Sequence, residues 1–188
     1  RGALRSTGIP AEEIVSMAVD CHSCSVMLCM RDGRPLMDCM IWMDVRAAAE
    51  SDEINAATGN ELSPEWMPAK LLWLKRNRPE LYGSAEVFCE MEDWMNFRLT
   101  GRWSVNINNS VNWGYNADNG CFSREFYETI GMPEAMDRFP ADTVFAVGDV
   151  MGKLLPSAAE ELGLSPETLV ACGGIDSSIG ILGMGVHE

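Results

Sequence analysis

The chain is short of basic residues and of histidine. Lys and Arg together number 14 against 28 Asp and Glu, so the formal net charge is −14 at pH 7, and there are 2 His. Nucleic acids and anionic lipid surfaces repel such a chain, because both are polyanions and no dense basic cluster reverses the sign locally. We therefore expect neither nucleic acid nor a membrane as a partner. An anionic nucleotide is not excluded, because amides, cations or Mg²⁺ at one site can bind it.

The sequence also lacks long apolar runs and a regular cysteine framework. No stretch reaches the roughly 18 uninterrupted apolar residues of a membrane-spanning helix, and the first residues lack a signal-peptide pattern. The 7 Cys are odd in number and irregularly spaced, which favours free thiols in a reducing cytoplasm. With 47% hydrophobic and 22% charged residues in 188, one compact domain in the cytoplasm is expected.

Short apolar runs alternate with helical patterns along the sequence. The runs Ile14–Val19 and Ser25–Met30 indicate strands of one sheet, and Asp32-Gly33 predicts a hairpin that returns through Leu36–Trp42. An antiparallel pair among strand-then-helix units favours an α/β fold with a mixed sheet flanked by helices. Further strands are predicted at 86–89 and 168–172, and helices at 46–58, 68–77, 91–99, 123–130, 157–162 and 177–184.

The segment Gly173-Gly174-Ile175-Asp176 joins the last predicted strand to the last predicted helix. Without a Cβ, the two glycines would let the backbone turn tightly and let a phosphate approach the amides at the helix start. The Asp176 carboxylate could then accept a proton from a hydroxyl that attacks a phosphoryl group. On local pattern alone, the commoner explanation is a strand end whose Asp176 caps the helix.

A second polar segment, Trp42 to Arg46, ends the third apolar run. In extended geometry Trp42, Asp44 and Arg46 would share one face. A carboxylate and a guanidinium could grip neighbouring hydroxyls of a polyol while the indole covers the apolar face of a sugar. The structural alternative is an ion pair between Asp44 and Arg46 that caps the next helix.

Two other patterns carry competing hypotheses. Cys21 and Cys24 form a Cys-x-x-Cys, which elsewhere marks redox or zinc chemistry, but no second such pair or His pair completes a metal site, so we expect no metal ligands of this kind. Residues 148–153 resemble a phosphate-binding loop but are one residue short between the glycines, and Leu154 stands where Ser or Thr should follow.

Several blocks in a fixed order resemble the FGGY carbohydrate kinases, most closely their ribulokinase-like and xylulokinase-like members. The similarity spans nearly the whole chain, which makes it more specific than any one motif. The blocks are Asp32-Gly33-Arg34-Pro35-Leu36, Trp42-x-Asp-x-Arg46, Lys70-Leu-Leu-Trp-Leu-Lys75, Pro79-Glu-Leu-Tyr82, Asp93-Trp-Met-Asn-Phe-Arg-Leu-Thr-Gly101, Ala158-Ala-Glu-Glu-Leu-Gly163 and Gly173-Gly-Ile-Asp176.

The resemblance implies an actin-like, ribonuclease-H-like domain and assigns roles to individual residues. Asp176 stands at the catalytic aspartate of the family, and Asp93 is expected to stay structural as a helix cap. ATP and Mg²⁺ are the implied cofactors, with Gly173 and Gly174 on the phosphate side. The residues implied to contact the sugar are Trp42, Asp44, Arg46, His22, Ser23 and Trp66.

The resemblance also predicts the domain organisation. The Asp-x-Gly-Thr motif that opens the family does not occur, so residues 1–188 are expected to be the sugar-binding N-terminal domain, incomplete at its start. Residues 173–188 would lead toward a C-terminal ATP-binding domain. The implied reaction is ATP-dependent phosphorylation of a sugar hydroxyl, with a ketopentose such as ribulose or xylulose as substrate, and this chain alone is expected to be inactive. The alternative is a non-catalytic sugar-binding or assembly module; a homodimer is compatible with both.

Overall fold

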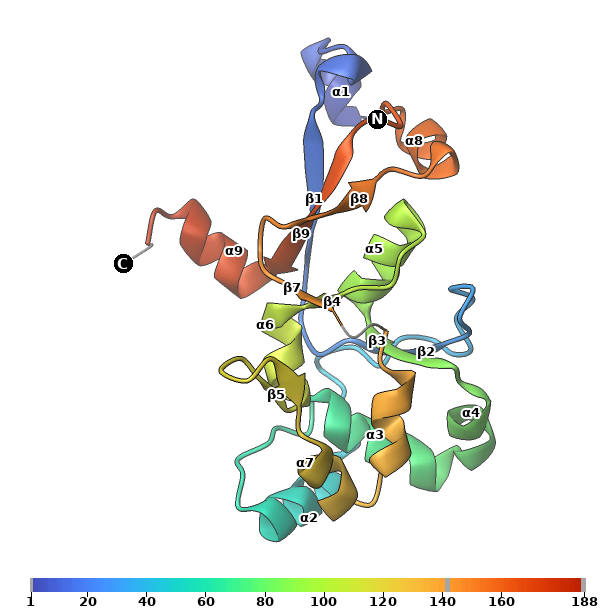
Figure 1. Cartoon of the computed structure of the whole chain (residues 1–188), viewed down its shortest axis with the longest axis vertical. Coiled ribbons are helices and arrows are strands. Elements are labelled where there is room, and N and C mark those ends of the chain that lie inside the picture. The colour runs from blue at the N-terminus through green and yellow to red at the C-terminus, as the bar shows by residue number, and fades with distance from the viewer. Residues whose placement is uncertain (1, 141–142, 187–188) are drawn as a thin grey trace.

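A computed structural model describes residues 2–140 and 143–186 (Figure 1). The helices are α1 Gly2–Thr7, α2 Ala48–Thr58, α3 Met67–Asn77, α4 Pro79–Ser84, α5 Met91–Thr100, α6 Ile107–Ser110, α7 Arg124–Thr129, α8 Pro156–Leu162 and α9 Asp176–Gly183, with short 3₁₀ turns at Ala11–Glu13, Val111–Trp113 and Pro133–Arg138. The strands are β1 Ser16–Cys21, β2 Val26–Cys29, β3 Val87–Glu90, β4 Val105–Asn106, β5 Tyr115–Asn116, β6 Cys121–Phe122, β7 Val144–Phe145, β8 Val150–Lys153 and β9 Leu169–Ile175.

The main sheet has three strands in the order β1-β9-β8. β1 runs parallel to β9, whereas β8 runs antiparallel to β9. The predicted mixed sheet is therefore confirmed, although β8 and not the expected hairpin supplies its antiparallel member. The prediction that the first two apolar runs share one sheet is wrong, because β2 pairs with β3 in a separate ribbon. Between β1 and β2 lies Cys24, whose backbone takes a left-handed conformation with φ 61°.

The expected hairpin after β2 forms only at its turn. Gly33 has φ 84° and donates its N–H to the Met30 carbonyl at 2.9 Å. The returning segment is not a strand, since it makes only isolated bridges, Cys29 to Pro35 and Val26 to Met40. Between the two bridges β2 advances by three residues, from Val26 to Cys29, whereas the returning segment spans five, from Pro35 to Met40, so a regular register is impossible. In addition, Pro35 has no N–H to donate.

The predicted helices are confirmed to within a few residues because their ends carry local signals. Gly59 and Gly101 take left-handed conformations after α2 and α5, and Ser123 Oγ accepts the Phe126 N–H at the start of α7. Asp93 does cap its helix, because its Oδ2 accepts the Glu90 N–H at 2.9 Å. α3 ends at Asn77, before Pro79, and Pro79 itself begins α4.

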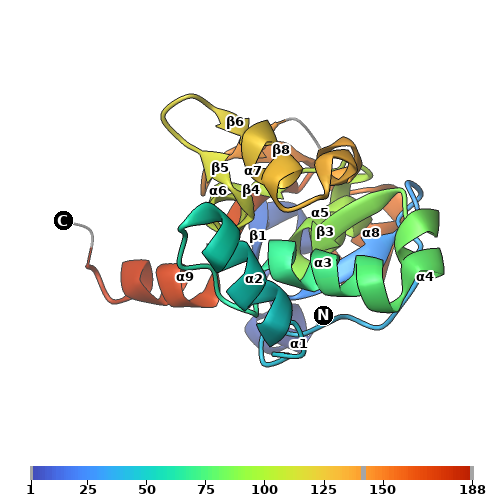
Figure 2. The ribbon, with the colours of Figure 1, turned by 90° about the horizontal axis from the view of Figure 1, so that it is seen from below.

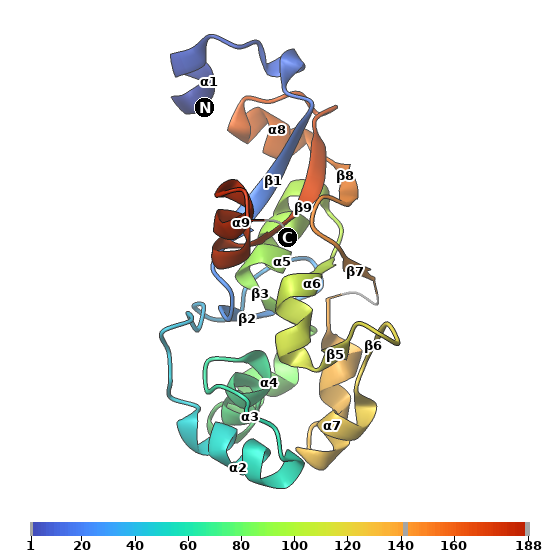
Figure 3. The same ribbon diagram turned by 90° about the vertical axis from the view of Figure 1, so that its left-hand side faces the viewer.

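Two regions of the molecule have different cores. α2, α3, α4 and α7 gather at one end, around the largest apolar cluster, and α8 and the main sheet lie at the other (Figure 3). α5 packs against β1, β8 and β9 of the main sheet and also against β3, whose Phe88 belongs to the largest apolar cluster, and so joins the two regions. α9 continues from the end of β9, has no buried residue, and projects from the body (Figures 1 and 2).

The predicted turn at Gly173 and Gly174 is wrong, because both lie inside β9 and neither has a positive φ. Their role in the fold is close approach. A Cβ on Gly173 would lie 1.7 Å from the Val19 carbonyl oxygen, where β1 has a register shift between Ala18 and Asp20. Only glycine lets the two backbones pass this closely.

Candidate active site

A cavity of about 350 Å³ opens at the end of the main sheet. Its lining is made by His22, Ser23, Cys24, Trp42, Glu65 and Asp176. Four of these six were selected from the sequence, and they come from segments as far apart as residues 22 and 176. The structure therefore brings the expected catalytic carboxylate and part of the expected sugar-binding set into one place.

Parallel strand pairing explains this convergence. Cys21 at the end of β1 is opposite Ile175 at the end of β9. Since the carboxyl ends of parallel strands meet at one edge of a sheet, the residues that follow, His22 and Asp176, emerge side by side. Asp176 is exposed at the start of α9, and its Oδ1 accepts the N–H of Ser177 at 2.7 Å.

The side chains in the cavity suit a polyol. Ser25 Oγ lies 2.7 Å from His22 Nδ1 and fixes the imidazole ring at the rim. Trp42 is 47% exposed, so its indole is available to cover the apolar face of a sugar ring. Glu65 and Asp176 contribute carboxylates, which accept hydrogen bonds from hydroxyl groups. The lining includes no Lys or Arg.

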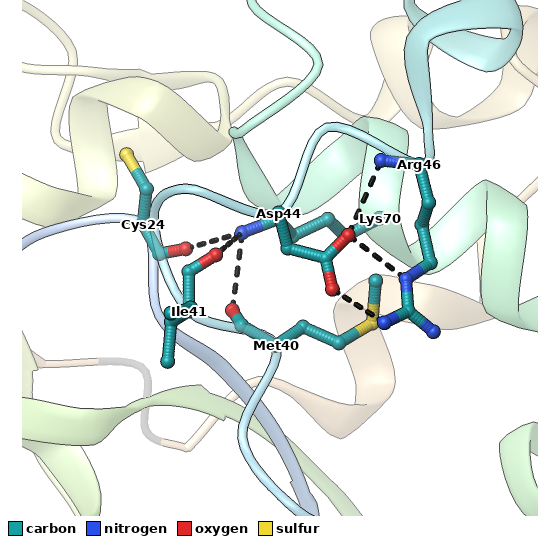
Figure 4. Close-up of polar contacts among 6 residues, drawn as sticks. All are labelled: Cys24, Met40, Ile41, Asp44, Arg46 and Lys70. Carbon is teal, nitrogen blue, oxygen red and sulfur yellow. Dashed lines mark hydrogen bonds and ion pairs between the residues drawn. The ribbon is translucent and has the colours of Figure 1, made fainter.

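The wall formed by Cys24 is held from behind by Lys70 (Figure 4). Lys70 lies in α3, is fully buried, and donates to three carbonyl oxygens: Cys24 at 2.6 Å, Ile41 at 2.8 Å and Met40 at 3.1 Å. Burial lowers the pKa of Lys70 below its usual value. This one ammonium group therefore links the turn after β1 to the segment that carries Trp42.

Glu90 holds the same turn from the other side. Its Oε2 accepts the Cys24 N–H at 2.7 Å and its Oε1 accepts the indole N–H of Trp113 at 2.7 Å. Glu90 is fully buried, and burial raises its pKa to about 7 although both hydrogen bonds act in the opposite direction. Burial likewise raises the pKa of the Cys24 thiol to about 11, so this thiol is a poor nucleophile at neutral pH.

Asp44 and Arg46 lie outside the residues that line this cavity. The segment does not extend as expected, because the Asp44 N–H bonds back to the Ile41 carbonyl at 2.9 Å, and the prediction of one shared face with Trp42 is wrong. Asp44 instead pairs with Arg46 through two contacts, Oδ1 to Nε at 2.8 Å and Oδ2 to a terminal nitrogen at 2.7 Å. These bonds hold the pKa of Asp44 below its usual value. Neither side chain caps α2.

Trp66 lines a different cavity, of about 410 Å³, with Asn60, Asn112 and Phe126 among its neighbours. Its sequence neighbour Glu65 belongs to the cavity of His22 and Asp176. The two hollows thus adjoin consecutive residues just before α3, and the expected aromatic wall stands next to the candidate site and outside its lining.

The carbonyl of Gly173 in β9 belongs to a buried polar network. The Asn106 side-chain amide donates to the Gly173 carbonyl at 2.8 Å and to Glu92 Oε1 at 2.9 Å. Burial raises the pKa of Glu92 to about 7. The position of β9 immediately before Asp176 is therefore supported by side chains from β4 and α5.

Sequence reasoning missed Glu65, Cys24, Lys70 and Glu90. For Lys70 a signal existed, because Met67, Leu71 and Leu74 place it on the buried stripe of its helix, where an uncompensated ammonium group is unusual. Glu65 and Glu90 look in sequence like ordinary acidic residues near a helix start, so only the tertiary structure reveals them.

Residues 2–140 and 143–186 contain neither a cluster of metal ligands nor a membrane-spanning helix. That part of the chain contains no group of three or more His, Cys, Asp or Glu side chains arranged to hold a metal ion, and none of its helices is long and apolar enough to cross a membrane. His187 lies outside the described residues. All seven cysteines are free thiols, Cys21 and Cys24 included.

Comparisons with known proteins show which sequences this chain is similar to. Residues 1–183 match the model of the FGGY family of carbohydrate kinases, N-terminal domain. The ribulokinase of Geobacillus thermodenitrificans is 25% identical over 218 residues, covering 98% of this chain and 37% of that protein. An FGGY carbohydrate kinase domain-containing protein of Danio rerio is 32% identical over 189 residues, covering 87% of this chain and 34% of that protein. The chain thus spans about a third of the length of these relatives.

Solved structures show the same fold. A xylulose kinase from Lactobacillus acidophilus superposes with a TM-score of 0.81 at 18% identity, covering 96% of this chain and 38% of that one. A xylulose kinase from Rhodospirillum rubrum superposes with a TM-score of 0.74 at 24% identity, covering 87% of this chain and 35% of that one. The mixed sheet with flanking helices is therefore the actin-like α/β fold of these kinases. With its match to the family model over residues 1–183, the chain belongs to the FGGY family of carbohydrate kinases.

Proposed function

We propose that this chain is the sugar-binding part of an ATP-dependent sugar kinase in which Asp176 is the general base. The observation that carries the proposal is the single cavity shared by Asp176, His22 and Trp42. A ketopentose is the proposed substrate, supported by relatives named ribulokinase and a structural neighbour named xylulose kinase. Because the chain covers about a third of those relatives, the reaction is assigned to the full-length protein.

Each residue of the cavity has a role in this proposal. Trp42 covers the apolar face of the sugar, while His22, Ser23 and Glu65 bind its hydroxyl groups. Asp176 accepts the proton of the attacking hydroxyl as that oxygen bonds to the γ-phosphorus of ATP. At the same time the bond between the γ-phosphorus and the oxygen that bridges it to the β-phosphorus breaks. Phosphorylated sugar and ADP leave, and the proton stays on Asp176 until solvent takes it. Asp44, Arg46 and Trp66, outside this lining, would contact the sugar only at its edges or after domain closure.

ATP supplies the phosphoryl group, and Mg²⁺ neutralises the charge of its phosphates. The cavity lining is neutral or acidic, and the described residues form no cluster of ligands for a metal ion. These residues fit the sugar and do not by themselves fit a triphosphate. Gly173 and Gly174 are buried inside β9 and do not line this cavity, so their contact with the phosphates stays a prediction from the family resemblance. We propose that residues 173–188 lead toward an ATP-binding domain and that residues 1–188 form the sugar-binding domain.

The test is a substrate screen on the full-length protein with ATP, in which ADP release is measured for ketopentoses, hexoses and polyols. Asp176→Asn keeps the shape of the side chain but cannot accept the proton, so turnover should fall by about 10²- to 10⁴-fold while sugar binding persists. Asp118→Asn, in an exposed turn, is the matched control and should retain activity. Unchanged turnover in Asp176→Asn would contradict the assignment.

The other class of function, a non-catalytic sugar-binding or assembly module, predicts sugar binding without ADP release for the wild type as well. Free thiols at all seven cysteines support the proposed cytoplasmic location. A homodimer remains a prediction, which light scattering on the full-length protein would test.

A further inference from the structure

The buried lysine of α3 has an unusual set of partners. Lys70 has 0% relative exposure, and its three hydrogen bonds all go to main-chain carbonyl oxygens. Among the described residues it makes no direct ion pair with a carboxylate. Burying a charge is unfavourable unless its contacts compensate, and an apolar side chain would fill the same space without that cost. The contacts themselves should therefore explain the charge.

Those contacts join two segments that build the candidate sugar site. Cys24 belongs to the turn after β1, which also carries His22 and Ser23, whereas Ile41 immediately precedes Trp42 (Figure 4). The two carbonyl groups converge on one ammonium group, at 2.6 and 2.8 Å. One side chain that does not line the cavity thus joins its two walls, next to the pair of main-chain hydrogen bonds between Val26 and Met40.

The backbone conformation of Cys24 also shows why the hydrogen bond from Lys70 is needed there. Its φ of 61° lies in the left-handed region, which is disfavoured for residues with a side chain. Glu90 accepts its N–H at 2.7 Å and Lys70 donates to its carbonyl, so a buried carboxyl group and a buried amine restrain one residue from both sides. Without Lys70 the turn keeps only one of these restraints.

We propose that Lys70 is a positioning residue for the sugar, which sets the separation between the wall of His22, Ser23 and Cys24 and the wall of Trp42. That the ligand is a sugar rests on the proposed function, whereas the role of Lys70 in placing the two walls rests on its hydrogen bonds alone. Loosening either wall misplaces groups that must contact the sugar together, so affinity for the sugar depends on Lys70 while the nucleotide contacts do not.

The experiment uses the full-length protein with three variants. Lys70→Met keeps an unbranched side chain one atom shorter and removes both charge and donors, and Lys70→Gln keeps two N–H donors on a shorter chain. Lys75→Met is the matched control, since Lys75 lies in the same helix but bonds to Glu134 and Gly131, away from the cavity. The first measurement is the alkylation rate of Cys24 by N-ethylmaleimide, followed by peptide mass spectrometry without substrate.

Loss of a hydrogen bond from a charged donor corresponds to about a tenfold change in an equilibrium. We expect Lys70→Met to raise the labelling rate of Cys24 about tenfold by opening the turn, with Lys70→Gln between it and the wild type. Cys172, buried in the cluster beneath α8, reports global opening and should label at the wild-type rate. Equal labelling of Cys24 in wild type and Lys70→Met overturns the proposal; should Lys70→Met not fold, the same comparison with Lys70→Gln decides.

The second measurement is steady-state kinetics. Lys70→Met should raise the KM for the sugar about tenfold and leave the KM for ATP unchanged, whereas a purely structural role would lower the amount of active enzyme and move neither constant. An unchanged sugar KM therefore also overturns the proposal. If the wild type phosphorylates no sugar at all, the proposed function fails, and the labelling result still decides the role of Lys70.

Discussion

Replacement of Gly173 by alanine tests the closest contact in the main sheet. The added methyl group would lie 1.7 Å from the Val19 carbonyl oxygen and 2.7 Å from the Val19 carbonyl carbon, whereas ordinary contacts begin at 3.4 Å. The shortfall of 3.4 − 1.7 = 1.7 Å is against main chain, which cannot rotate away as a side chain can. Relief requires β1 to separate from β9, so Gly173→Ala should cost about 3 kcal/mol or more of the free energy of unfolding.

Two other glycines provide a graded comparison. At Gly174 an added Cβ would meet Ile179 Cδ1 at 2.9 Å and Asn108 Oδ1 at 3.0 Å, both side-chain atoms, so Gly174→Ala should cost only about 1 kcal/mol. At Gly180, within α9, nothing lies within 4 Å, and Gly180→Ala should stabilise the protein by about 0.5 to 1 kcal/mol.

Urea unfolding followed by circular dichroism measures all three variants. With a slope of about 2 kcal/mol per molar urea, the loss expected for Gly173→Ala lowers the midpoint by about 1.5 M. A midpoint for Gly173→Ala within about 0.5 M of the wild type, at the same slope, would refute the close approach of the two strands.

Two further predictions concern buried polar groups. Burial raises the pKa of Glu92 from 4.5 to about 7, so between these values the folded protein keeps a proton that the unfolded chain has released. The contribution of Glu92 to stability should then be lost as pH rises from about 4.5 to about 7, and Glu92→Gln should make the decline measured in urea titrations less steep, while buried Glu90 accounts for the part that remains; an equally steep decline would contradict the pKa direction. Trp113→Phe removes the indole N–H that donates to Glu90 and leaves a void, so it should lower the free energy of unfolding by about 2 to 4 kcal/mol, measured in the same titrations. A loss below about 0.5 kcal/mol would count against that hydrogen bond.

The helices were largely predictable from the sequence because their signals are local. Gly59, Gly101 and Ser123 each mark an end through the conformation or hydrogen bonds of that residue itself. The strand pairing was not predictable in the same way. The partner of β1 is β9, and β2 pairs with β3, and nothing in the short apolar runs specifies which distant segment completes each ladder.

The candidate site was predictable where a residue follows a strand end. His22 and Asp176 do so, and the family resemblance selected both, Asp176 through the Gly173-Gly-Ile-Asp176 block and His22 outside the blocks. The geometry of Trp42 to Arg46 was mispredicted because the extended conformation assumed for it is replaced by a turn that closes on Ile41. The burial of Lys70 could be inferred from its helical stripe, but its partners could not, since its contacts are with main-chain atoms and leave no complementary residue to find in the sequence.

The parallel pairing of β1 with β9 has a consequence for how the site assembles in time. Cys21 and Ile175 are separated by 175 − 21 = 154 positions, so nearly the whole chain forms the loop that their contact closes. Closing a loop of that length costs about 4 to 5 kcal/mol of chain entropy beyond the constant term. During synthesis from the N-terminus, β1 can pair with β9 only after β9 has been synthesised. The cavity, which needs residues that follow both strands, therefore forms only when almost all of this chain has been made.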